Sequence, residues 1–152
     1  MSALFAFLHH LAAFALVSAL AVELVLVRSG MKPSNARRLL AIDAIYGAAA
    51  GTILVVGFLR VFFFEKGASY YFHSIPFIIK ISLFAAVGLL SIYPTRHFLS
   101  WRQPLRQGSV PAFDAGKLQA IRRVIRWELI ALVGLILCAA LMARGIGYVG
   151  AA

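Results

Sequence analysis

Acidic residues and cysteines are scarce in this sequence. The 152 residues include five Asp and Glu against fifteen Lys and Arg, and Cys138 is the single cysteine. One cysteine cannot form an intrachain disulfide, and without a CxxC motif there is no thiol-based metal or redox site. No spaced pair of carboxylates in a cleft, Ser-His-Asp set, Walker loop or HExxH motif appears. The hydrolase and nucleotide-driven classes therefore have no support.

Long stretches of the chain also lack charge. Hydrophobic residues make up 62% of the sequence and charged residues 13%, and the mean hydropathy is +0.92. A soluble domain of this size cannot bury so much apolar surface. The charges lie at the borders of apolar runs, and no polar domain is present to read nucleic acid. We predict an all-α polytopic membrane protein with the lipid bilayer, not nucleic acid, as its partner.

The apolar runs predict a single transmembrane domain over residues 1–152, folded as a bundle of four helices. The first run, residues 3–22, carries no formal charge and is long enough to cross a hydrocarbon core of about 30 Å. No Lys or Arg precedes it, which disfavours a cleaved signal peptide. Pro76 suits the first turn of the third helix, and Pro94 suits its end. The expected helices cover about residues 3–27, 39–64, 75–94 and 118–146.

Basic residues gather in two of the three connections between these helices. Positively charged loops are retained in the cytoplasm, so both connections should face it and both termini should lie outside. In the second connection, Leu118, Ile121 and Ile125 follow helical spacing among basic residues. The fourth helix is therefore predicted to begin as an amphipathic segment on the membrane surface, with anionic lipid headgroups as its partners.

The second helix contains a run of small residues, Gly47-Ala-Ala-Ala-Gly51. Glycines four residues apart allow two helix backbones to approach closely in lipid. We expect this run to lie in the tightly packed interior of the bundle, and a homo-oligomer contact between two chains is the alternative.

Titratable residues at membrane depth form two predicted layers. Such groups are expensive in lipid, so they are the default candidates for function. In the inner layer, spacing along the second helix would let Asp43 pair with Arg126 or Arg38. We interpret this layer mainly as structural polar pairs, with proton relay as the alternative. Its members are Glu23, Asp43, Tyr46, Glu128 and Arg126.

The outer layer is cationic and rich in imidazole. His9 shares a face of the first helix with Glu23, whereas His10 points about 100° away, so only one histidine should face the interior. A neutral imidazole can ligate haem iron, and Arg or Lys can hold propionates. A haem or porphyrin site, a purely interfacial role and a proton or ion pathway all remain open. The members are His9, His10, Arg60, Lys80, Arg144, Tyr70, Tyr71 and His73.

Several short segments carry a family resemblance. They are Gly57-Phe-Leu-Arg60, Glu65-Lys66-Gly67, Gly88-Leu-Leu-Ser91 and Met142-Ala-Arg144-Gly145, together with Lys80. Through them the sequence resembles, over nearly its whole length, the bacterial domain-of-unknown-function 2214 family. That resemblance implies a four-helix protein of the bacterial inner membrane and gives no reaction.

The sequence is more distantly similar to the HemJ-type protoporphyrinogen oxidases, small four-helix membrane proteins that carry haem b. A helix-one histidine and a helix-three lysine of that family have counterparts in His9 or His10 and in Lys80, and His97 also fits. The paired histidines, Pro94 and the long loop before the fourth helix depart from its pattern. The similarity implies haem binding, and porphyrinogen oxidation only remotely.

Two functional hypotheses follow. In the first, the chain is a redox or porphyrin protein in which His9 or His10 ligates the iron of haem b. Lys80 and Arg60 would contact the propionates, and Tyr70 or Tyr71 would shield the outer edge. In the second, it is a non-enzymatic membrane subunit or a small transporter with no cofactor. The sequence does not decide whether the chain is an enzyme.

Overall fold

A computed structural model describes residues 2–64 and 71–149 of the chain. These residues form four long helices, each long and apolar enough to cross a membrane, and they contain no strand. A π-helical turn, η1 (Arg60–Phe64), prolongs the second long helix, and the short α5 (Arg102–Arg106) follows the third. The predicted all-α fold with four spans is confirmed. The long helices are α1 (Ser2–Arg28), α2 (Pro33–Leu59), α4 (Ile75–Ser100) and α6 (Ala115–Ala143).

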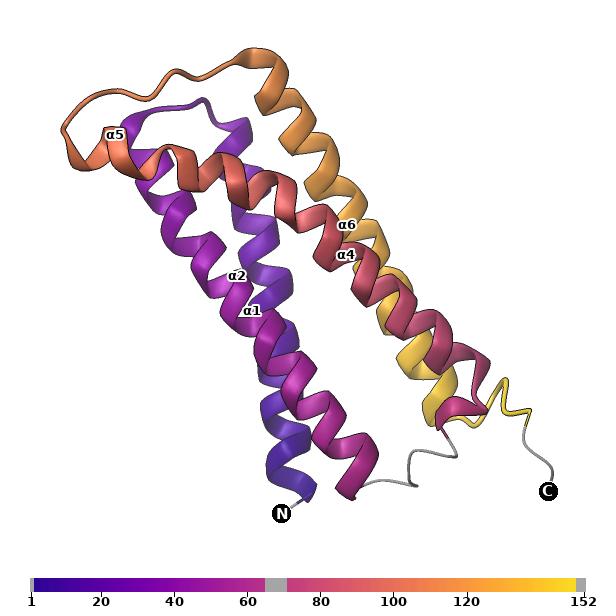
Figure 1. Cartoon of the computed structure of the whole chain (residues 1–152). Coiled ribbons are helices and arrows are strands. Elements are labelled where there is room, and N and C mark those ends of the chain that lie inside the picture. Colours follow the sequence, from indigo (N-terminus) through magenta and orange to yellow (C-terminus); the bar gives the residue numbers. More distant parts are fainter. Residues whose placement is uncertain (1, 65–70, 150–152) are drawn as a thin grey trace.

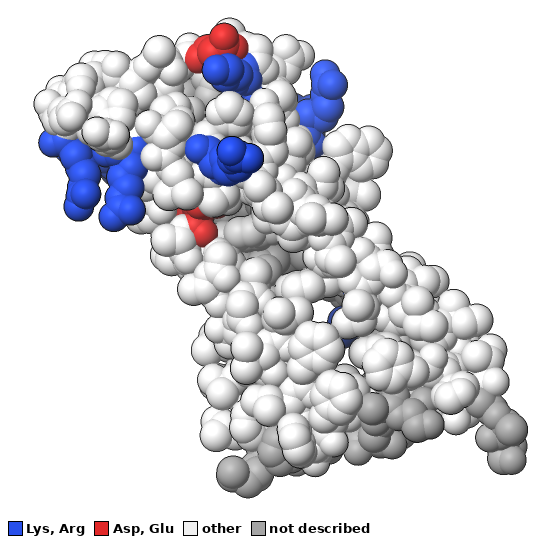
Figure 2. Space-filling model, viewed as in Figure 1, with Lys and Arg blue, Asp and Glu red and all other residues white. Residues whose placement is uncertain are grey.

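The long helices form two antiparallel pairs (Figure 1). α1 packs along α2 and α4 along α6, and the pairs meet mainly through α1 and α6. The start of α1 and the end of α6 lie together at what we call the terminal end. The connections 29–32 and 107–114 lie at the opposite, basic end, over which Lys and Arg gather in Figure 2. The two basic connections therefore lie on one side, as expected.

The hydrophobic core lies towards the basic end. Leu39, Phe98, Ile121 and Ile125 are completely buried there. Ile121 and Ile125 belong to the segment that was expected to lie on the membrane surface. That expectation is corrected, because α6 runs without a break from Ala115 and its apolar stripe packs into the bundle.

Two helix boundaries differ from those predicted. α2 begins at Pro33, six residues before the first apolar run, because proline is tolerated in the first turn of a helix. α4 does not stop at Pro94 but continues to Ser100. A proline inside a helix removes one backbone donor, and transmembrane helices tolerate this where neighbouring groups compensate. The α6 boundary is set by Asp114, whose side chain accepts a hydrogen bond from the Lys117 backbone N–H at 2.8 Å.

The two glycines of the small-residue run of α2 do not lie in the bundle interior, which corrects the first expectation for them, whereas Ala49 of the same run is buried in the core. Gly47 and Gly51 are both exposed, and a side-chain carbon at either position would meet no neighbouring atom within 4 Å. A close approach occurs at another glycine: a side-chain carbon at Gly134 would lie 3.2 Å from Cδ1 of Leu83 on α4. Gly57 lies beside the His9 ring on α1, where a side-chain carbon would make an ordinary contact.

The segment after α6 is tied back to the start of α4. The Ile75 N–H donates to the Gly147 carbonyl at 3.0 Å, and the Val149 N–H donates to the His73 carbonyl at 2.9 Å. Gly147 has a φ of +80°, and a side-chain carbon there would lie 2.8 Å from Cδ of Pro76. Glycine is needed at this position for both reasons. We call the paired residues 73–75 and 147–149 the terminal clamp.

Candidate functional site

Three carboxylates from three helices come together inside the packed half of the bundle. Glu23 on α1, Asp43 on α2 and Glu128 on α6 are 1%, 8% and 0% exposed. Glu23 lies within electrostatic reach of both other carboxylates, and Glu128 lies within reach of Asp43. Tyr46 faces all three. We call Glu23, Asp43 and Glu128 the carboxylate cluster.

The hydrogen bonding of the cluster is incomplete. The Thr95 hydroxyl on α4 donates to Oδ1 of Asp43 at 2.6 Å. Tyr46 on α2 makes a side-chain contact with Ser91, which also lies on α4. Oε1 of Glu23 and both carboxylate oxygens of Glu128 are buried without a hydrogen-bond partner among the described residues. Buried polar atoms in native structures nearly always have a partner. The two unsatisfied glutamates therefore make this cluster the first candidate for a functional site.

The expected pairing of the inner layer with arginines is corrected. Asp43 accepts its hydrogen bond from Thr95, and neither Arg38 nor Arg126 forms an ion pair with it in the part of the chain that the structure describes. Both arginines are exposed. Their side chains point outwards because the apolar stripe of each helix, not its basic face, packs into the core. Glu23, Asp43, Tyr46 and Glu128 do come together, as the layer assignment predicted, whereas Arg126 stays apart.

A basic cluster lies closer to the terminal end. His9 on α1 is half-buried against Gly57, and its Nδ1 is buried without a hydrogen-bond partner in the part of the chain that the structure describes. Arg60, the first residue of η1, and Lys80 on α4 both act electrostatically on His9 and on each other. We call His9, Arg60 and Lys80 the basic cluster. In Figure 2 the terminal half of the visible face is almost free of charge, apart from one recessed basic group.

The remaining residues of the outer layer are placed differently. His10 is exposed, and its Nδ1 lies 2.6 Å from the Ala6 carbonyl oxygen in the same helix. His9 is therefore the histidine that faces the interior, and His10 is turned away from it. The Tyr71 ring packs at a tilt against Phe77, with 5.2 Å between the ring centres. His73 and Arg144 are exposed, and Tyr70 lies outside the described residues.

Sequence reasoning missed the two hydroxyls that α4 contributes to the site. Thr95 was overlooked because Pro94 was taken as the end of the helix, which would have left the threonine in a loop. Ser91 precedes Pro94 by about one turn, and its hydroxyl also donates to the Gly88 carbonyl at 2.8 Å. Had the helix been extended through Pro94, helical spacing would have put Ser91 and Thr95 on one face.

Comparison with known proteins gives one family. Residues 1–147 match the model of a family described as "Predicted membrane protein (DUF2214)". No curated protein and no solved structure matches the chain. The first of the two resemblances in the sequence is thus confirmed, and the similarity to HemJ-type oxidases has no support from these comparisons.

Proposed function

We propose, from the premise that this chain belongs to the DUF2214 family of predicted membrane proteins, that it exchanges protons within the bilayer. It would act as a small transporter or as a subunit of a larger assembly, with the carboxylate cluster as its proton-binding site. The observation that supports this most is Glu128, which is completely buried while neither of its carboxylate oxygens has a hydrogen-bond partner within residues 2–64 and 71–149. Acidic residues at membrane depth typically belong to ion or proton pathways.

The proposal follows from the charge that the cluster can hold. Three negative charges within reach of one another, in a core of low dielectric, need compensation. No lysine or arginine forms an ion pair with these carboxylates in the described ranges 2–64 and 71–149, so the chain's own cations are not that compensation. Among the described residues, no group of three His, Cys, Asp or Glu side chains has a geometry that could hold a metal ion. The proton is the remaining ion that needs no further ligands.

Proton exchange can be measured after reconstitution. Purified protein is placed in liposomes that contain a pH-sensitive dye, and the internal pH is followed after an external pH step. Glu128→Gln should slow the proton flux about a hundredfold, since positioned proton-transfer groups contribute at least that much. Asp114→Asn is the matched control, because it makes the same carboxylate-to-amide change outside the cluster and keeps a capping side chain.

Infrared spectroscopy separates proton binding from transport. The wild-type protein should show a carbonyl band from a protonated carboxyl group, and that band should be lost in Glu128→Gln or Glu23→Gln but kept in Asp114→Asn. A protein that shows neither the band nor any flux above empty liposomes would refute the proposal. A band without flux would favour a subunit over a self-contained transporter.

A haem b or porphyrin site is the second candidate, and the orphaned Nδ1 of His9 favours it. His9 would hold the haem iron, and Lys80 and Arg60, which act electrostatically on His9, would hold the anionic propionates. His10 does not fit as a second ligand, because it is exposed and engaged with its own helix. Haem would supply one-electron redox chemistry, and the chain's own residues would bind and orient it.

The haem candidate is tested by absorption. Protein purified after growth with a haem precursor, or after haem addition, should show a Soret band that His9→Ala removes. His10→Ala is the matched control and should keep it. A missing band in the wild type, or equal loss in both variants, would eliminate the haem site without affecting the carboxylate cluster.

Sidedness and lipid partners also belong to the proposal. We infer that the basic end faces the cytoplasm of a bacterial inner membrane and that both termini lie outside, because basic loops are retained inside. Reporter fusions at residue 109 and at the C-terminus should report opposite sides.

A hollow of about 270 Å³ lined by Gln119, Arg122, Arg123 and Arg126 suits an anionic lipid headgroup at the basic end. Contact of the exposed Gly47–Gly51 face with a second copy stays a prediction.

A further inference from the structure

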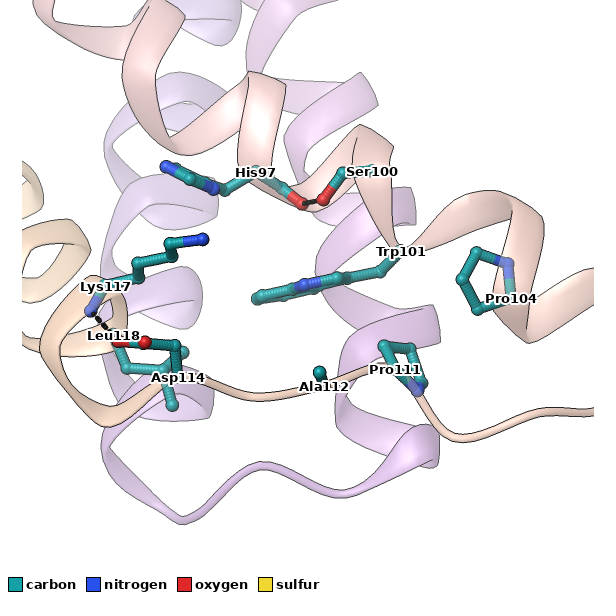
Figure 3. Close-up of a pocket in the computed structure, with 9 residues that line it drawn as sticks. All are labelled: His97, Ser100, Trp101, Pro104, Pro111, Ala112, Asp114, Lys117 and Leu118. Carbon is teal, nitrogen blue, oxygen red and sulfur yellow. Dashed lines mark hydrogen bonds between the residues drawn. The ribbon is translucent and has the colours of Figure 1, made fainter.

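A pocket of about 190 Å³ lies at the basic end, apart from both clusters (Figure 3). Its walls come from the end of α4, from α5, from the 107–114 connection and from the first turn of α6. Sites for drug-sized ligands usually have volumes of about 300–1,000 Å³. This pocket therefore has room for a small molecule only.

The indole of Trp101 forms one wall and is held in place by other rings. Phe98 and Phe113 each lie 5.4 Å from it, ring centre to ring centre. Pro104 and Pro111 line the pocket near Trp101 and have stiff side chains. A rigid aromatic face loses little conformational entropy when a flat ligand stacks on it.

The polar side of the pocket is set by Lys117. Figure 3 shows its side chain reaching towards the Trp101 ring, with His97 on one side and Asp114 on the other. Oδ1 of Asp114 is occupied by the Lys117 backbone N–H, and the Ser100 hydroxyl donates to the His97 carbonyl. The His97 ring is steadied by Tyr93, with 4.6 Å between the ring centres. The ammonium of Lys117 and the imidazole of His97 are thus the groups left to meet a ligand.

We propose that this pocket binds a small planar organic anion, a carboxylate on a single aromatic or heteroaromatic ring. The ring would lie against the small part of the buried Trp101 indole that lines the pocket, and the carboxylate would lie between Lys117 and His97, away from Asp114. The concentration of Lys and Arg at this end raises the local concentration of anions around the pocket mouth. The site does not depend on proton exchange by the carboxylate cluster.

Tryptophan fluorescence provides a direct test with benzoate as the probe. The chain has two tryptophans, so Trp127→Phe leaves Trp101 as the sole emitter. In a neutral detergent, benzoate should change this emission saturably, and neutral benzamide should bind at least about tenfold more weakly because it lacks the charge. Lys117→Gln in the same background should weaken benzoate binding about tenfold, the loss of one charge-assisted contact. Lys32→Gln, an exposed lysine at the same end, should leave it unchanged.

Trp101→Phe distinguishes binding in the pocket from partition of benzoate into the detergent, because the exposed Trp127 is then the only emitter. A similar response of Trp127 over the same benzoate concentrations would overturn the proposal. So would equal binding of benzoate and benzamide, or equal effects of Lys117→Gln and Lys32→Gln. If Trp101→Phe does not fold, the comparison between the two lysine variants decides alone.

Discussion

The two ends of the bundle are packed to different degrees. At the basic end, Phe98 and Ile121 are 0% exposed, whereas at the terminal end Phe7 and Phe63 are 62% and 74% exposed. In lipid, an apolar side chain loses little by facing outwards, so helices associate through close packing and polar contacts instead. The basic end has both close packing and polar contacts, since the core surrounds the carboxylate cluster. The fold is therefore held mainly from the basic end, where a site needs fixed geometry.

The largest expected effect tests this contrast directly. Phe98→Ala should lower the free energy of unfolding by about 3 kcal/mol, because it leaves a cavity in the packed end. Phe63→Ala, which removes the same side chain from the terminal end, should change it by less than about 0.5 kcal/mol. Thermal unfolding in detergent measures both. Equal losses would show that the two ends contribute alike.

The next effect concerns the link between α4 and the carboxylate cluster. Thr95→Val removes the hydroxyl that donates to Asp43 and should cost about 2 kcal/mol, since a buried acceptor loses its partner. Thr52→Val is the matched control, because the Thr52 hydroxyl bonds only to the Ala48 carbonyl of its own helix and is exposed. Chemical denaturation in detergent compares the two, and an equal loss in both variants would contradict the cluster contact.

At the terminal end the close packing is local, at the terminal clamp. Gly147→Ala should cost about 1–2 kcal/mol, because alanine is strained at a φ of +80° and its side chain would meet Pro76. Gly145 also has a positive φ but lies in open space, so Gly145→Ala measures the backbone strain without the contact with Pro76. Hydrogen exchange should speed up at the Ile75 and Val149 amides in Gly147→Ala, and far less in Gly145→Ala.

The smallest effect has the opposite sign. Glu128→Met should stabilise the protein by about 1 kcal/mol, because replacing a buried, unpartnered carboxylate with an apolar side chain removes a desolvation cost. Ile130→Met, on the lipid-facing side of the same helix, should leave stability unchanged. A marked loss in Glu128→Met would mean that the carboxylate is part of the structural framework. A gain would fit a residue retained for function.

The sequence was sufficient for the four spans, and it pointed to the inner carboxylates and Tyr46 as one group. Apolar runs of the right length leave few alternatives in a bilayer, and spacing along one helix puts Asp43 and Tyr46 on one face. The sequence was not sufficient to identify the hydrogen-bond partners of these residues. Which side chain meets Asp43 depends on how α2, α4 and α6 are rotated about their axes, and that rotation is a tertiary property. The arginine partners were inferred from the face of the second helix that carries Asp43 and from the predicted inner layer, and Thr95 was the partner found.

Proline and glycine signals were informative in some places and misleading in others. Pro33 begins a helix earlier than the apolar pattern suggests, and Pro94 does not end one, because membrane helices tolerate a missing donor. Gly47 and Gly51 have the spacing of a packing motif but are exposed, while the isolated Gly134 allows a close contact with Leu83. A lone glycine carries no spacing that could reveal its role.

The terminal clamp has a mechanical consequence for the whole molecule. α4 and α6 are joined at one end by the 107–114 connection and at the other by the bonds between residues 73–75 and 147–149. Two helices that are joined at both ends cannot slide along each other, so we expect α4 and α6 to move as one rigid body. If the bundle opens, α4 and α6 would then rotate together away from α1 and α2, about the contact between α1 and α6. The α1–α2 and α4–α6 contacts would be kept.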